Sequence, residues 1–125
     1  MADWPGSAKQ LEAAVAQDQN SDELRFYLGS AYEEMERIPD AMKQYRAALQ
    51  LNPDHYRANL LLGRILAIQN QAQDALPYLQ KAVKLQPQSA DAHKFLGNVY
   101  MVLGEMENAR RELGAAERLK LIAEP

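Results

Sequence analysis

The side chains with the greatest capacity for chemistry in this sequence are its two histidines, His55 and His93. Imidazole can act as a general base or as a metal ligand, but either role needs partner groups at a suitable spacing. The two histidines are far apart in sequence, and no carboxylates surround them at the spacing of metal ligands. We interpret His55, which follows Asp54, as a turn residue and not as a general base.

Other reactive residue types are equally sparse. The chain has no cysteine, which excludes disulfides and thiolate metal sites. Glu33, Glu34 and Glu36 form an acidic run of the kind that is usually solvated. The sequence has neither a phosphate-binding glycine loop nor a nucleophile motif. We therefore predict that the chain is not an enzyme and binds no metal or other cofactor.

Composition and charge favour an ordinary folded domain. The chain has 125 residues, of which 47% are hydrophobic and 25% charged. Its net charge of -3 provides no basic field for nucleic acid or for an anionic membrane. No apolar run reaches the roughly 18–20 residues that cross a bilayer. The first five residues lack the basic and apolar regions of a signal peptide, which favours a cytoplasmic location but leaves the compartment open.

The secondary structure expected from this sequence is entirely helical. Apolar residues recur at helical spacing, and no stretch alternates as a half-buried strand does. We predict seven helices, namely one lone helix over about residues 5–17 and three antiparallel pairs. Because the lone helix matches the second half of a pair, we expect the sequence to have been cut from a longer array; an unusual start is the alternative.

Residue types repeat along the chain with a period of 34. The central copy contains Leu62, Gly63, Leu66, Ala75, Leu79, Ala82 and Pro87. The same roles occur earlier at Leu28, Gly29, Tyr32, Ala41, Tyr45, Ala48 and Pro53. They occur later at Leu96, Gly97, Tyr100, Ala109, Leu113 and Ala116, with Leu121 in place of the proline. A period of this length indicates stacked supersecondary units.

The period predicts one domain over residues 1–125, made of a lone helix in 5–21 and repeats over 22–55, 56–89 and 90–123. Ser21 and Ser89 are expected to cap the first helices of two repeats, because a serine hydroxyl accepts from an unpaired backbone N–H. Gly104 is expected to end a helix in the left-handed conformation.

This pattern of Leu-Gly, a following Tyr or Leu, two alanines and a proline resembles the tetratricopeptide repeat. The resemblance covers all of the chain except its last few residues. It implies an all-α, right-handed solenoid of antiparallel helix pairs, in which the first helix of each pair lines a concave groove. Proteins of this family bind other proteins, usually through peptides in that groove, so we expect a protein or peptide partner and neither nucleic acid nor membrane.

The family's frame also implies which residues face the groove. Its apolar members are expected to accept apolar side chains, its cations to hold a carboxylate, and its asparagine to pair with peptide backbone. The predicted groove residues are Phe26, Ser30, Arg57, Leu60, Arg64, Lys94, Phe95, Asn98 and Met101. The alternative is that Tyr27, Leu61 and Phe95 pack between helices and that the charges form a solvated face.

Two functions of different class remain open. The first is an adaptor that binds a partner in the groove. The second is an assembly module whose copies stack end to end into homo-oligomers, motivated by the half repeat at the start and by an incompletely polar last helix. A repeat segment within a larger multidomain protein is a further alternative.

Overall fold

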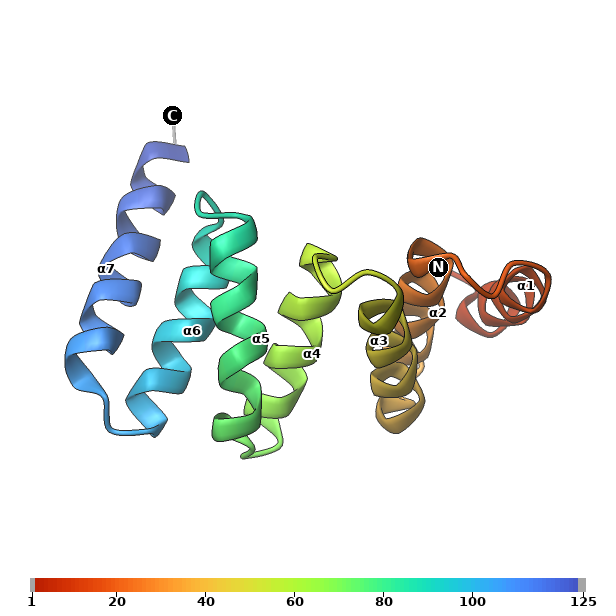
Figure 1. Ribbon diagram of the computed structural model, residues 1–125, viewed down its shortest axis with the longest axis horizontal. Coiled ribbons are helices and arrows are strands. Elements are labelled where there is room, and N and C mark those ends of the chain that lie inside the picture. The colour runs from red at the N-terminus through yellow and green to blue at the C-terminus, as the bar shows by residue number, and fades with distance from the viewer. Residues whose placement is uncertain (1, 124–125) are drawn as a thin grey trace. The chain divides into compact units, whose positions relative to one another are not determined.

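The computed structural model describes residues 2–123, which form seven helices and no strand (Figure 1). The helices are α1 (Trp4–Gln17), α2 (Asp22–Glu34), α3 (Ile38–Leu51), α4 (Tyr56–Ile68), α5 (Ala72–Leu85), α6 (Ala90–Val102) and α7 (Met106–Ala123). The predicted all-helical fold of one lone helix and three pairs is confirmed. In the part of the chain that the structure describes, none of the helices is both long enough and apolar enough to cross a bilayer.

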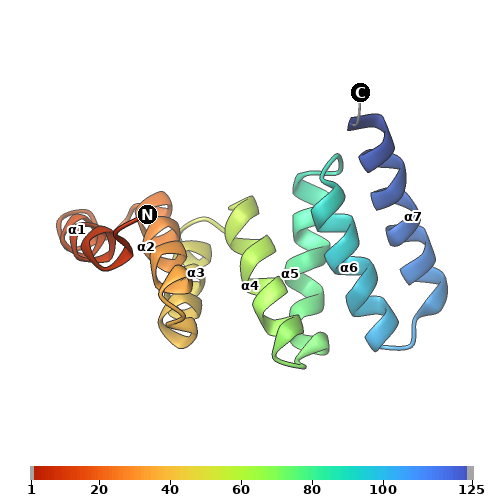
Figure 2. The same cartoon turned by 180° about the vertical axis from the view of Figure 1, so that it is seen from behind.

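The chain folds as two compact units, which we describe separately. Unit 1 is Met1–Ala58 and contains α1, α2 and α3, with α2 packed against both of the others. Unit 2 is Asn59–Pro125 and contains most of α4 together with α5, α6 and α7. Within unit 2, α6 lies between α5 and α7 and packs against both (Figures 1 and 2).

The helices that open the repeats begin with the same capping geometry. The Ser21 hydroxyl accepts a hydrogen bond from the Leu24 amide at 3.1 Å, and the Ser89 hydroxyl accepts from the Ala92 amide at 3.2 Å. Both predicted caps are thus confirmed. His55 lies one repeat period from each serine, and it occupies the equivalent position before α4.

The turns inside the repeats also share one backbone conformation. Glu36, Asn70 and Gly104, which follow one another at the repeat period, have φ angles of 60°, 62° and 79°. The left-handed conformation predicted for Gly104 is therefore confirmed. Asparagine tolerates this region better than most residues, whereas an ordinary side chain such as that of Glu36 costs about 1–2 kcal/mol there.

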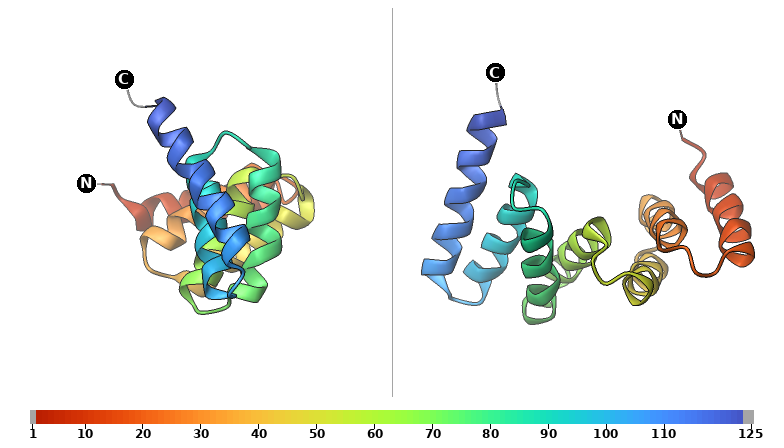
Figure 3. Two further views of the ribbon diagram at one scale, coloured as in Figure 1. Left: turned by 90° about the vertical axis from the view of Figure 1, so that its left-hand side faces the viewer. Right: turned by 45° about the horizontal axis from the view of Figure 1, so that its top comes forward.

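Three glycines allow the two helices of each repeat to approach closely. A Cβ atom added to Gly29, Gly63 or Gly97 would lie 2.7 Å from a side chain of the second helix in the same repeat. Those partner residues are Tyr45, Leu79 and Leu113. The antiparallel approach of α6 and α7 that Gly97 permits is visible in Figure 3. The same packing solution thus recurs in all three repeats.

The lone helix α1 is held against α2 by apolar and polar contacts. Ala8 and Val15 are buried, and the Tyr32 hydroxyl on α2 donates a hydrogen bond to the Glu12 carboxylate. Burial, followed by the hydrogen bond and negative charge of Glu12, raises the pKa of Tyr32 to about 12. The neutral phenol is therefore the form that the folded unit 1 stabilises.

Candidate functional site

Unit 2 has an apolar hollow of about 310 Å³, which we call the aliphatic hollow. The residues that line it come from α4, the start of α5 and α6, and include Arg64, Ile68, Ala72, Phe95, Asn98 and Val102. Three predicted groove residues, Arg64, Phe95 and Asn98, therefore lie together on this surface. Arg64 is the only charged residue in the lining.

The aliphatic hollow is built from equivalent positions of two repeats. Arg64 and Asn98 are one repeat period apart, as are Ile68 and Val102, which end α4 and α6. Ile68 is 73% exposed and Val102 is 74% exposed. Two aliphatic side chains that are left so accessible beside an apolar hollow are the kind of surface that a partner covers.

A second hollow of about 510 Å³ lies on the α7 side of α6, and we call it the charged hollow. Its lining includes Asp91, Lys94, Asn98, Leu113, Glu117 and Lys120. Lys94 and Asn98 were predicted from the family's frame, whereas the contributions of α7 were not. Asn98 belongs to both hollows, so the two hollows meet on the exposed face of α6.

Leu60 and Met101, the other predicted residues of unit 2, lie outside both linings. Leu60 is partly buried, and Met101 is an exposed side chain on α6. Phe95 is also partly buried, and it contributes to the aliphatic hollow.

The predicted residues of unit 1 form a different arrangement. Phe26 is only 3% exposed, and its ring lies 5.7 Å from that of Tyr45 and 5.0 Å from that of His55. The Arg57 guanidinium stacks over Phe26 at 4.5 Å from the ring centroid. Ser30 Oγ is 3.3 Å from the Tyr45 hydroxyl. Phe26 thus acts as a buried support beneath Arg57.

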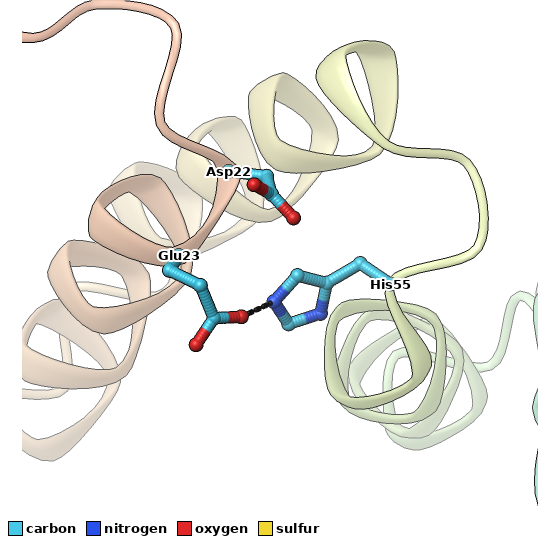
Figure 4. A group of neighbouring side chains, drawn as sticks. All are labelled: Asp22, Glu23 and His55. Carbon is cyan, nitrogen blue, oxygen red and sulfur yellow. Dashed lines mark hydrogen bonds and ion pairs between the residues drawn. The ribbon is translucent and has the colours of Figure 1, made fainter.

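Asp22, Glu23 and His55 come together (Figure 4), and Arg57 Nη2 lies 3.8 Å from Glu23 Oε2. Each offers one potential metal-ligand atom, and these atoms lie within 4.8 Å of one another. His55 Nε2 is 2.5 Å from Glu23 Oε1, and Asp22 accepts a hydrogen bond from Asn52 Nδ2 at 3.0 Å. That hydrogen bond lowers the pKa of Asp22. Judged by residue type alone, the two carboxylates and the imidazole of this cluster would suit a divalent cation.

The hydrogen bonds of His55 argue against a metal at this cluster. The Ala58 backbone amide lies 3.1 Å from Nδ1, and an amide can only donate, so Nδ1 is an acceptor. The neutral ring then carries its proton on Nε2, where it donates to Glu23. A metal bound at Nε2 would displace this proton. The ring would then either carry its proton on Nδ1 and lose the hydrogen bond from Ala58, or become an imidazolate. The geometry is that of a helix cap in which histidine replaces serine.

Sequence reasoning missed this cluster because its acids precede the histidine by almost a whole repeat. The repeat period itself contained the necessary signal. Ser21 and His55 share a position in successive repeats, and the first helices of successive repeats are neighbours in stacked arrays. Asp22 and Glu23, which follow Ser21, are therefore brought to the start of the next repeat.

His93 is the second buried histidine, and it joins α6 to α7. Its Nε2 lies 2.8 Å from the Pro87 carbonyl oxygen, which only accepts, so Nε2 carries a proton. Its Nδ1 lies 3.3 Å from Glu112 Oε2. Both side chains are almost completely buried. The pair is a structural link between the last two helices.

Comparison with known proteins identifies the repeat. A family model described as tetratricopeptide repeat matches residues 1–49 and 29–88, and a second model of the same description matches residues 66–119. A search among curated proteins found no significant match.

Solved structures of MamA share the fold. One crystal structure of MamA has a TM-score of 0.85 and 21% identity, covering 94% of this chain and 68% of its own. MamA from position 41 to its end, from Desulfovibrio magneticus RS-1, has a TM-score of 0.86 and 24% identity, covering 93% of this chain and 66% of its own. This chain thus spans about two thirds of the length of the chains in those structures.

The comparisons and the fold agree on the class of protein. Proteins of this repeat family are typically non-enzymatic modules for protein interaction and scaffolding, which is consistent with the predicted absence of catalysis. Residues 1–88, well over half of the sequence, match one family model, and the described residues form one lone helix followed by three helix pairs. The chain is a member of the tetratricopeptide repeat family.

Proposed function

We propose that this protein is an interaction module that binds a peptide segment of its partner over the exposed face of α6. The aliphatic hollow is the observation that carries this proposal. Its volume falls in the range of roughly 300–1,000 Å³ that is typical of ligand sites. Its rim is formed by Ile68 and Val102, both about three quarters exposed.

The residues around the aliphatic hollow suit a peptide ligand. An apolar side chain of the partner would remove the rim residues from water, which stabilises the complex by about 25 cal/mol for each Å² of apolar surface buried. The exposed Asn98 amide has both donors and an acceptor, so it can pair with the N–H and C=O groups of an extended backbone. Lys94 and Met101 extend this face of α6.

Peptide selection tests the proposal directly. A library of random twelve-residue peptides displayed on phage would be selected on the full chain, and recovered peptides would be synthesised and titrated. We expect Val102→Asp to weaken their binding at least tenfold, because it places a charge on the apolar rim. Ile122→Asp makes the same change at another aliphatic residue, 80% exposed, that lies outside the hollow. Failure to recover any binding peptide, or equal losses in both variants, would refute peptide binding at this site.

Self-association is the second candidate function, and the end of α7 favours it. Leu121 and Ile122 are 68% and 80% exposed in the last turns of this helix. Sedimentation over a range of protein concentrations is expected to show oligomers that Ile122→Asp dissociates and Val102→Asp does not. A monomer at every concentration would exclude this function without bearing on peptide binding.

A further inference from the structure

Resting on the second candidate function, self-association, we infer that the end of α7 in one copy of the chain docks on an uncovered face of α1 in a second copy. We call this face the α1 stripe, and it consists of Trp4, Ser7, Leu11 and Ala14, which follow one another at helical spacing. The contact joins the last helix of one chain to the first helix of another, so it links copies head to tail.

The α1 stripe occupies positions that the first two complete repeats bury. Its last three members have equivalents one and two repeat periods later, all of them 0% exposed: Ala41, Tyr45, Ala48, Ala75, Leu79 and Ala82. In those repeats a glycine of the first helix lies against the middle residue of each set. The described residues give α1 no such first helix, so Ser7, Leu11 and Ala14 are partly exposed and Trp4 is 36% exposed.

The end of α7 carries aliphatic side chains that can cover this face. α7 has 18 residues, whereas α3 and α5 have 14 each, and it reaches beyond the neighbouring α6 (Figure 1). Leu121 stands where Pro53 and Pro87 follow the shorter helices, so no proline stops α7 there. Leu121 and Ile122 are 68% and 80% exposed. Contact with the α1 stripe would remove this apolar surface from water.

The charges on the two helices favour a contact between unlike ends. The exposed charged residues of α1 and its two caps are three acids and one cation, Asp3, Glu12, Asp18 and Lys9. Those of α7 are four cations and two acids, Arg110, Arg111, Arg118, Lys120, Glu107 and Glu117. One minus three gives -2 for α1, and four minus two gives +2 for α7. Contact of α1 with α7 therefore joins opposite charges, whereas contact of either helix with its own copy joins like charges.

Two variants, each lacking one of the two surfaces, test this arrangement. Trp4→Asp places a carboxylate on the α1 stripe and leaves α7 intact, and Ile122→Asp does the reverse. Each variant alone is expected to self-associate at least tenfold more weakly than the unaltered chain, because a charge enters an apolar contact. An equimolar mixture is expected to form a dimer that grows no further, because it retains one intact α1 stripe and one intact α7 end. Sedimentation at matched concentrations measures these sizes.

Trp4 also reports the contact directly, because it is the only tryptophan in the chain. In the mixture, tryptophan emission comes only from the Ile122→Asp chain, whose α1 stripe is intact. We expect its emission to shift to shorter wavelength as the Trp4→Asp chain is added and to saturate at one equivalent. The matched control is the double variant with both substitutions, which should leave the emission unchanged. Raising the salt concentration should weaken the contact, because the charges that attract each other are exposed.

The outcomes separate head-to-tail contact from the alternatives. Undiminished self-association of Trp4→Asp would indicate contact of α7 with α7, and that of Ile122→Asp would indicate contact of α1 with α1; either result, or a monomeric mixture, would overturn the inference. If circular dichroism shows that Trp4→Asp loses helix, Ser7→Lys replaces it in the sedimentation test, because it adds a cation to the α1 stripe. Oligomers that depend on Ile122 but not on the α1 stripe would uphold self-association while overturning this inference.

Discussion

Replacing Gly97 by alanine tests the close helix contact on which each repeat depends. The added Cβ would lie 2.7 Å from Leu113 Cγ and 3.2 Å from the Leu113 backbone nitrogen. A side chain can rotate away, but the backbone contact requires α7 to shift. Alanine favours a helix interior by about 1 kcal/mol over glycine, whereas overpacking a core costs about 1–3 kcal/mol. Subtracting the gain from the cost leaves an expected net loss of up to about 2 kcal/mol in the free energy of unfolding.

Gly114→Ala is the matched control, because Gly114 also lies within a helix of unit 2. Its added Cβ would meet only Arg118 Nη1, at 3.5 Å, so no neighbour has to move. The gain in helix propensity from alanine should therefore remain, and the free energy of unfolding of Gly114→Ala should be higher by about 1 kcal/mol. Urea denaturation followed by far-ultraviolet circular dichroism measures both changes as shifts in midpoint. If both alanine variants move the midpoint upward by similar amounts, the close-contact explanation is refuted.

Three further predictions concern unit 1. His55→Ala should be less stable than His55→Ser by about 1 kcal/mol in urea denaturation, because serine at this position keeps a helix cap; equal stabilities would contradict the capping role. Addition of Zn²⁺ should leave the thermal midpoint unchanged, because His55 Nδ1 already accepts from Ala58 and Nε2 donates to Glu23; a metal-dependent rise would show that the cluster binds the ion. Because the folded pKa of Tyr32, about 12, exceeds its ordinary value of about 10, its contribution to stability is complete below pH 10 and is lost as the pH rises toward 12. Tyr32→Phe should lack this loss, as measured by denaturation at pH 9 and pH 11.

Much of the fold could be predicted from residues whose local structural roles are recognisable in the sequence. Ser21 and Ser89 are recognisable caps, Gly104 is a recognisable turn residue, and the repeat period reveals which helices pair. The identity of the atoms opposite Gly29, Gly63 and Gly97 is less local. It depends on the antiparallel register of two helices, which periodicity implies but does not specify atom by atom.

The candidate site was harder to predict, because exposure depends on what surrounds a residue. Phe26 and Phe95 are both predicted groove residues, yet Phe26 is buried beneath Arg57, while Phe95 contributes to an open hollow. The family's frame also places Ile68 and Val102 at the groove, but it does not give their exposed fractions of 73% and 74%.

The histidine cap has a consequence for exchanging modules within this chain. The Ser21 and Ser89 hydroxyls each accept from the helix that follows them, whereas the His55 ring also pairs with the carboxylate of Glu23 from the preceding module. The positions equivalent to Glu23 are Arg57 and Asp91. If a rearranged gene carried two successive copies of the module that begins at His55, the ring N–H of the second copy would face the Arg57 guanidinium of the first. The charges at these positions, as well as the packing of the helices, therefore favour one linear order of the modules.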